Sequence, residues 1–260
     1  MISTGTLLAA AFLGALLELD EYFVGMMLLS QPVIAGGLAG FLCGDPAAGI
    51  MMGGIVQLIW LMPPVGAYVP PSPSAIAFSA VFMGVMTSRV QPQDEKQAVL
   101  MFALIVGASF GYFTGQMDVW NRKLNTRIMR AFEKKIEERG ARYAYLVQAL
   151  AVLAKYFRDV AGYIIIFFLA TPLVMKIYDT LPDQIVKGLR IAFWAAPMIG
   201  FAVLFDMFRT KQGAIFLGGV LVLAYLLFSV YRINLLFFLL FILAAGIFIV
   251  YDTVWNRKAS

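Results

Sequence analysis

The chain has 260 residues, of which 62% are hydrophobic and 13% are charged, and its formal net charge is +5. Soluble domains are roughly half apolar and about one quarter charged, so this composition excludes a soluble domain and indicates an all-α, polytopic membrane protein. The chain has no histidine and one cysteine. That excludes an ordinary zinc site, a Ser-His-Asp triad, an internal disulfide and a phosphohistidine on this polypeptide, and we expect no metal and no cofactor.

Apolar runs predict the membrane segments. Residues 1–117 contain five of them: Ile2–Leu17, Tyr22–Gly44, Ala47–Met62, Ala75–Thr87 and Ala98–Gln116. Residues 160–260 contain four more: Val160–Met175, Ile191–Met207, Gly213–Val230 and Leu235–Tyr251. Several runs are shorter than the ~20 residues that a straight helix needs to cross a bilayer. Because short runs interrupted by Gly or Pro are typical of broken or re-entrant helices, we expect an irregular N-terminal part and conventional C-terminal spans.

Three acidic residues, Glu18, Asp20 and Glu21, lie between the first two apolar runs. They are either solvated at the membrane surface or, if they lie within it, candidates for function, because a charge in the membrane is costly. A fourth, Asp45, precedes Pro46 and is expected to cap the helix that begins near Ala47.

Glycines recur every four residues in two rows, which are Gly36, Gly40 and Gly44, then Gly107, Gly111 and Gly115. Small residues at this spacing allow helices to approach closely within a membrane. A faint internal repeat is an alternative, but close packing is the interpretation that we prefer.

Five of the eleven prolines fall within Pro63–Pro73, inside a stretch that carries no charge from Pro46 to Ser88. Proline removes a backbone donor and breaks helices, so Pro63–Ser74 is not an ordinary helix. Irregular backbone at membrane depth is tolerated only where protein buries it or where it lines a polar cavity. This re-entrant proline loop is therefore the first candidate for a substrate site.

Residues 118–159 form a third region of different character. Ten of the twenty Lys and Arg residues lie between Asp118 and Asp159, around apolar residues that recur every four positions from Trp120. This pattern predicts a basic amphipathic helix at the membrane interface or a soluble helical hairpin, with a stop at Gly140. The cluster also indicates a cytoplasmic side, and no motif indicates nucleic-acid binding.

The polar residues near the proline loop are uncharged. Gln57 lies among aliphatic residues six positions before the double proline, and Gln31 is a second amide within an apolar run. A buried amide needs hydrogen-bond partners, so Gln57 binds either a ligand hydroxyl or a neighbouring helix. The loop adds Tyr68, Ser72 and Ser74, and neutral groups of this kind suit a polyhydroxylated, uncharged ligand.

One stretch of the chain resembles a known family. The residues QPVIAGGLAGFLCGD (31–45), GIMMGGIVQLIW (49–60) and PVGAYVPPS (64–72) are similar to the membrane IIC component of the mannose/fructose/sorbose family of the phosphotransferase system. The resemblance covers roughly residues 20–80 and extends more loosely to residues 200–217, where DMFR (206–209) is similar to a short polar break.

The resemblance implies a subunit for sugar uptake by phosphoenolpyruvate-dependent group translocation in the bacterial inner (cytoplasmic) membrane. Its implied partners are a IID membrane subunit, soluble IIA and IIB phosphocarrier domains, the lipid bilayer and two further copies in a trimer, with elevator-type movement. The implied substrate is a sugar of the mannose/fructose/sorbose class. We expect the sugar-binding residues to be Gln57, Val65, Gly66, Ala67, Tyr68, Pro71, Ser72 and Ser74.

The chain departs from the family pattern at two of these positions. Gln57 stands where mannose transporters have a glutamate, and Ser72 stands at the position of a loop aspartate. These departures motivate an alternative function, a non-transporting membrane scaffold or regulator that retains the IIC fold. An unrelated carrier of small solutes is a third hypothesis.

Overall fold

The computed structural model describes residues 3–22, 27–60, 71–200, 202 and 219. The chain divides into two compact units, residues 1–201 and 202–260, and the description below concerns the first. Two of the predicted C-terminal segments, Gly213–Val230 and Leu235–Tyr251, fall outside the described residues except for Gly219.

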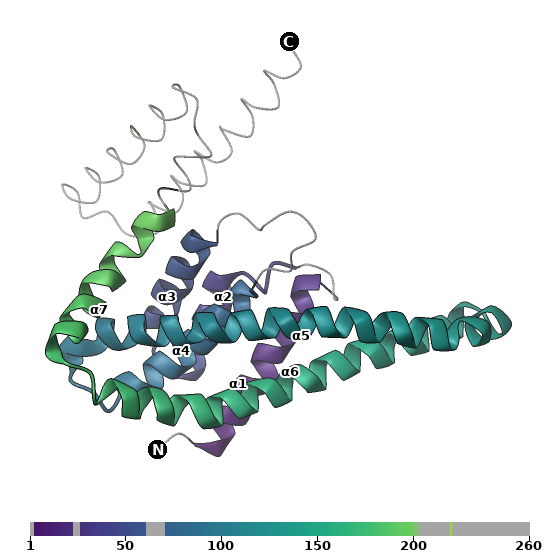
Figure 1. Cartoon of the computed structure of the whole chain (residues 1–260), viewed down its shortest axis with the longest axis horizontal. Coiled ribbons are helices and arrows are strands. Elements are labelled where there is room, and N and C mark those ends of the chain that lie inside the picture. Colours follow the sequence, from purple (N-terminus) through teal and green to yellow (C-terminus); the bar gives the residue numbers. More distant parts are fainter. Residues whose placement is uncertain (1–2, 23–26, 61–70, 201, 203–218, 220–260) are drawn as a thin grey trace, which may run out of the picture. The chain divides into compact units, whose positions relative to one another are not determined.

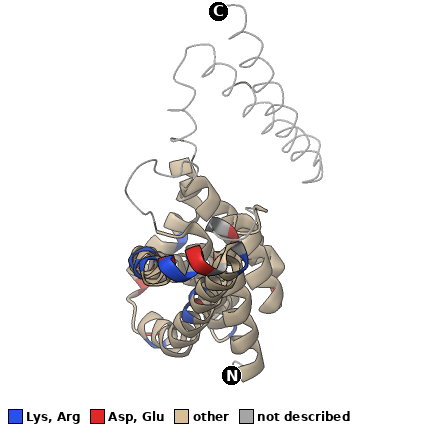
Figure 2. Ribbon diagram, turned by 90° about the vertical axis from the view of Figure 1, so that its right-hand side faces the viewer, with Lys and Arg blue, Asp and Glu red and all other residues tan. Residues whose placement is uncertain are grey.

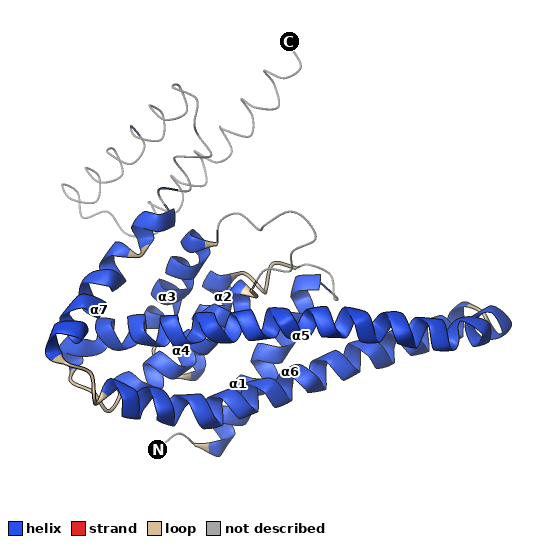
Figure 3. Cartoon of the chain, viewed as in Figure 1, coloured by secondary structure: helices blue, strands red, loops and turns tan. Residues whose placement is uncertain are grey.

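The described part of the first unit is helical throughout, without strands (Figure 3). Its helices are α1 (Thr4–Tyr22), α2 (Pro32–Leu42), α3 (Pro46–Ile59), α4 (Pro73–Ser88), α5 (Lys96–Arg139), α6 (Ala141–Tyr178) and α7 (Asp183–Ala195), with a 3₁₀ turn at Gln93–Glu95. Proline begins α2, α3 and α4, because its fixed φ and missing N–H suit the first helical turn. The prediction of an all-helical chain is confirmed for this part.

Helix α4 lies at the centre of the unit, packed against α1, α2, α3, α5 and α6 (Figure 1). Every residue from Ser74 to Ser88 is buried, so α4 has no exposed face. Its aromatic rings pack on those of α6, with Phe82 and Phe167 stacked at 4.1 Å between ring centroids. A helix that is apolar all round and enclosed in this way is the core element of its bundle.

Glycine contacts bring α2 and α3 together. A Cβ placed on Gly40 would lie 2.7 Å from the Cα of Gly49, and one on Gly53 would lie 2.4 Å from the carbonyl oxygen of Pro32. The two backbones are therefore in direct contact, as small residues permit. Gly44 serves differently, because its φ of +71° lies in the left-handed region that closes the α2–α3 turn.

The second glycine row joins α5 to α4. A Cβ on Gly107 would lie 2.9 Å from the Cβ of Ala80, and one on Gly111 would lie 2.1 Å from the side chain of Ile76. Close packing is thus confirmed for the first two glycines of each row.

The prediction of one segment over Tyr22–Gly44 is wrong. Helix α1 continues to Tyr22, and α2 begins only at Pro32. Before it, Leu28 has a φ of +65°, and Gln31 is extended, the conformation that a following proline imposes. The Asp20 carboxylate accepts hydrogen bonds from the N–H groups of Met27 (2.7 Å) and Ser30 (3.0 Å), which fixes this turn.

The predicted start of a segment at Ile191 is also wrong. Helix α7 begins at Asp183, directly after Pro182, where proline is favoured before or at the first helical turn. Leu189 and Phe193 are its buried residues, four apart on one face. The part of the predicted segment that follows Ala202 lies outside the described residues.

Helices α5 and α6 form a long antiparallel hairpin (Figure 1). The predicted segments Ala98–Gln116 and Val160–Met175 are portions of these helices, which extend into residues 118–159 from both sides. Gly140, with a φ of +74°, separates them, as predicted. By length and composition, Gln93–Lys135 and Arg142–Tyr178 are candidate membrane spans. The interfacial or soluble placement of residues 118–159, and the division of the chain at their ends, remain predictions.

Candidate functional site

The two amides singled out in the sequence form a pair. The Gln57 Nε2 group, on the last turns of α3, donates a hydrogen bond of 2.9 Å to Oε1 of Gln31, the residue that precedes α2. The glycine contacts between α2 and α3 bring these distant positions together. The Gln57 Oε1 atom is buried and has no hydrogen-bond partner among the described residues. It is therefore an acceptor that a hydroxyl group can satisfy.

Ser72 ends the proline loop and begins α4. Its Oγ accepts a hydrogen bond from the Ala75 N–H (3.2 Å), and its own N–H donates to the Gly111 carbonyl of α5 (3.2 Å). Its hydroxyl also donates to Oε1 of Glu18 on α1, at 2.9 Å. The residue is buried, so Ser72 ties three helices together at the point where the loop rejoins the bundle.

The other predicted loop residues divide into two groups. Val65, Gly66, Ala67 and Tyr68 lie outside the described residues. Pro71 is half-buried, whereas Ser74 is buried, and its hydroxyl has no hydrogen-bond partner in the part of the chain that the structure describes.

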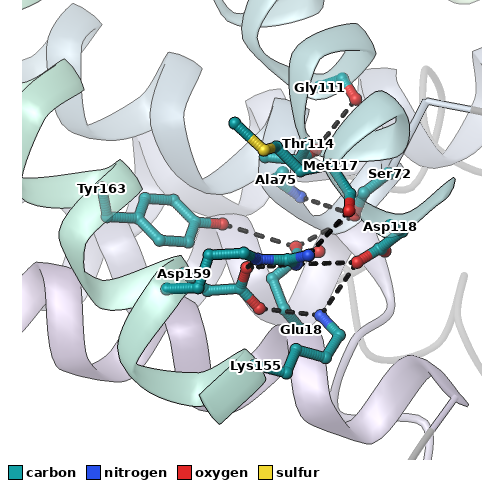
Figure 4. A network of polar contacts seen from close by, with 11 residues as sticks. Glu18, Ser72, Ala75, Gly111, Thr114, Met117, Asp118, Lys155, Asp159 and Tyr163 are labelled. Atoms are coloured by element: carbon teal, nitrogen blue, oxygen red, sulfur yellow. Dashed lines mark hydrogen bonds and ion pairs between the residues drawn. The ribbon is translucent and has the colours of Figure 1, made fainter. Parts of the chain in front are cut away.

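Glu18 is a polar residue of the site to which sequence reasoning gave no specific role. It is 2% exposed, and besides Ser72 it receives a hydrogen bond from the Tyr163 hydroxyl of α6, at 3.4 Å (Figure 4). The sequence carries a signal for this position, because Glu18 follows Ala11 and Ala15 at helical spacing on the buried face of α1. Of the two alternatives for the acidic residues near this junction, solvation is wrong for Glu18 and Asp20, both of which are buried.

An ion cluster lies beside Glu18 (Figure 4). Asp118 of α5 contacts Lys155 Nζ at 3.3 Å and Arg158 at 2.8 Å, and Asp159 contacts the same two cations at 2.7 and 2.6 Å. Lys155 is only 1% exposed. Each buried charge has an opposite partner, as a buried cluster requires, and the Glu18 carboxylate is a third negative charge that acts on Lys155. The cluster therefore holds α5 and α6 in register.

A small cavity connects the cluster with Glu18. It has a volume of about 40 Å³, and Thr114, Asp159 and Tyr163 are among its lining residues. A water molecule needs at least about 10–15 Å³ and several polar partners, so this cavity can hold water but not a sugar. No group of three or more His, Cys, Asp or Glu residues in the described ranges has a geometry that could hold a metal ion.

Asp45 has the role predicted for it. Its carboxylate accepts a hydrogen bond of 3.1 Å from the Ala48 N–H and so caps α3. It also pairs with Lys96 at the start of α5, at 2.5 Å, which links the α2–α3 turn to the hairpin.

Polar pairs on both sides of an interrupted apolar segment, in a bundle of closely packed apolar helices, are features of membrane transport proteins. The family model of the PTS system sorbose-specific IIC component matches residues 4–249. The chain therefore belongs to this family of membrane components of sugar transport, as the resemblance implied.

Curated relatives and solved structures agree with this assignment. The chain is 27% identical over 208 residues to the sorbose-specific EIIC component of Lacticaseibacillus casei, covering 75% of this chain and 70% of the relative. It is 26% identical over 185 residues to that of Klebsiella pneumoniae, covering 70% and 65%. The fold of this chain is also similar to that of a solved membrane protein (TM-score 0.67, 20% identity, 100% and 98% covered). A second likeness is to the mannose transporter ManYZ in complex with microcin E492 (TM-score 0.50, 19% identity, 100% and 97% covered).

Proposed function

We propose that this chain is the IIC-type translocation subunit for a sugar that is taken up by phosphoenolpyruvate-dependent group translocation. The observation that carries the proposal is the family match over residues 4–249. The absence of histidine from the sequence is consistent with phosphoryl transfer by soluble IIA and IIB domains.

The sugar site is proposed to lie between the two polar pairs. Gln57 of the first pair precedes residues 61–70 along the chain, and Ser72 of the second pair follows them. The unpartnered Gln57 Oε1 atom accepts a sugar hydroxyl, and the buried Ser74 hydroxyl is available as a donor or acceptor. Glu18 supplies a carboxylate next to Ser72, and Ser72 stands where the family pattern has a loop aspartate. Val65, Gly66, Ala67, Tyr68 and Pro71 complete the proposed site.

The proposed assembly has the chain crossing the bacterial cytoplasmic membrane several times, beside a IID-type subunit. Two relatives are bacterial proteins, and the solved structure of ManYZ is similar in fold. A homotrimer of such pairs and elevator-type movement are part of the same proposal. The mannose/fructose/sorbose class is the proposed range of substrates.

Uptake of radiolabelled mannose, fructose and sorbose tests the proposal. The assay uses cells that express the chain with its IID, IIA and IIB partners. We expect uptake of one of these sugars that depends on phosphoenolpyruvate and that falls about five- to hundredfold in Gln57→Leu, because a buried acceptor worth about 1–3 kcal/mol is lost. The matched control is Gln148→Leu, which makes the same change at an exposed position of α6. Absence of uptake for all three sugars with every partner present contradicts the proposal.

A non-transporting scaffold that retains the IIC fold is the second candidate function. The observation that favours it is the engagement of the Ser72 hydroxyl, which already bonds Glu18 and the first turn of α4. This candidate predicts no saturable sugar binding by the unmodified complex and none after Gln57→Glu and Ser72→Asp. Saturable binding to the unmodified complex excludes it.

A further inference from the structure

A groove of about 540 Å³ opens at the base of the α5–α6 hairpin. It is lined by one face of α5 and by one residue of α6, namely Met117, Trp120, Asn121, Lys123, Leu124, Arg127 and Arg158. Its volume falls within the range of about 300–1,000 Å³ that is usual for small-molecule sites.

The polar lining of the groove favours an anion. Lys123 and Arg127 are exposed, and neither forms an ion pair with another described residue. Arg158, by contrast, is neutralised by Asp118 and Asp159. Asn121 is 6% exposed, and its Nδ2 donor has no partner within the described ranges. A buried amide donor without a partner, beside two unpaired cations, is an incomplete polar site that an anionic oxygen completes.

The other half of the lining is apolar. Met117, Trp120 and Leu124 line the groove, and Trp120 leaves 72% of its surface exposed. A fully hydrated anion, such as inorganic phosphate, gains nothing from these side chains. A ligand that carries an acidic head and an apolar body satisfies both halves, and tryptophan is enriched where such molecules meet water.

The position of the groove also indicates a lipid. Residues 97–117 of α5 and 160–175 of α6 carry no charge, whereas charged residues are frequent from Asp118 onward and before Val160, in the part of the hairpin that faces the viewer in Figure 2. The groove thus spans the change from apolar to basic helix, where a membrane protein meets the headgroup layer. Basic pockets between helices at this level bind anionic headgroups.

We propose that the groove formed by Trp120, Asn121, Lys123, Arg127 and neighbouring residues binds an anionic phospholipid, with its phosphate at the cations and Asn121 and its acyl chains along Met117, Trp120 and Leu124. The bound lipid fixes the hairpin at the membrane surface. This proposal does not rest on the proposed function, so either can fail without the other.

Quenching of tryptophan fluorescence by brominated lipid tests this proposal on the full-length protein in phosphatidylcholine nanodiscs. Brominated phosphatidylglycerol is compared with brominated phosphatidylcholine, and Trp120→Phe identifies the signal of Trp120. We expect brominated phosphatidylglycerol to quench Trp120 more strongly than brominated phosphatidylcholine does. The double variant K123Q/R127Q is expected to reduce this preference about fivefold for each cation removed. Asn121→Ala, which changes no charge, is expected to reduce it at least about threefold.

The matched control is R130Q/K134Q, which removes two exposed cations of α5 that do not line the groove. It is expected to leave the preference for phosphatidylglycerol at Trp120 unchanged. An equal loss in both double variants, or no effect of Asn121→Ala, indicates diffuse surface attraction and overturns the proposal. Displacement of the brominated lipid by millimolar inorganic phosphate at constant ionic strength identifies a site for free phosphate and also overturns it.

Discussion

Replacing Ser72 with alanine removes two hydrogen bonds of the hydroxyl and leaves its backbone in place. One bond caps α4 through the Ala75 N–H, and the other reaches the Glu18 carboxylate at 2.9 Å. Loss of an N-cap costs about 1 kcal/mol, and loss of a hydrogen bond to a buried charged group costs about 1.5–3 kcal/mol. The expected loss in the free energy of unfolding is therefore roughly 2–4 kcal/mol.

Ser74→Ala is the matched control. Ser74 is as buried as Ser72, but its hydroxyl has no partner among the described residues. Because removal of a buried, unsatisfied hydroxyl relieves a desolvation cost, we expect Ser74→Ala to be neutral or slightly stabilising.

Thermal unfolding of the purified protein in detergent measures both variants. A change of 1 kcal/mol shifts the melting temperature of a chain of this size by about 2–4 °C, so Ser72→Ala is expected to lower Tm by roughly 4–16 °C. Ser74→Ala is expected to leave it unchanged or higher. Equal destabilisation by the two variants would refute the assignment of Ser72 as the residue that joins the loop to Glu18.

Two further predictions concern packing and charge. Gly53→Ala is expected to lower the free energy of unfolding by about 1–3 kcal/mol, since its Cβ would lie 2.4 Å from the Pro32 carbonyl oxygen. Gly54→Ala has open space around it and is expected to raise this free energy by up to about 1 kcal/mol through helix propensity. Chemical or thermal unfolding of both variants checks this, and equal effects contradict the α2–α3 contact. Lys155→Met is expected to cost about 3–5 kcal/mol because it leaves two buried carboxylates with one cation. In a double-mutant cycle with Asp159→Asn, the second change is expected to cost less than it does alone, and strict additivity would contradict the direct ion pair.

The sequence predicts the local structure well where one residue determines it. The Asp45 cap, the start of α3 beside it and the stop at Gly140 were predicted from single residues. The starts of α2 at Pro32 and of α4 at Pro73 were not predicted. The glycine rows predicted close helix packing, because glycine has no Cβ and allows the backbones of apolar helices to approach closely. The break between Tyr22 and Pro32 was missed because apolar character continues through it, while the turn depends on hydrogen bonds to Asp20.

The candidate site was predictable only in part. The sequence marks Gln57 and Ser72 as candidates, because polar groups and prolines are conspicuous in an apolar sequence. The sequence does not predict their pairing with Gln31 and Glu18, since these partners lie 26 and 54 residues away along the chain, and only tertiary packing brings them together. The cluster around Lys155 was missed for a similar reason, because its charges belong to a region whose other cations are exposed.

Equilibrium binding of sugar to the purified chain with its IID partner, without soluble phosphocarriers, tests the central claim most directly. We expect saturable binding of one sugar of the mannose/fructose/sorbose class, weakened about five- to hundredfold by Gln57→Leu, since removing a buried hydrogen-bonding group costs about 1–3 kcal/mol. Gln148→Leu is expected to leave the affinity unchanged. Binding that is absent from the unmodified complex, or equal in Gln57→Leu and the unmodified protein, contradicts the claim that the amide pair before the proline loop is part of the sugar site.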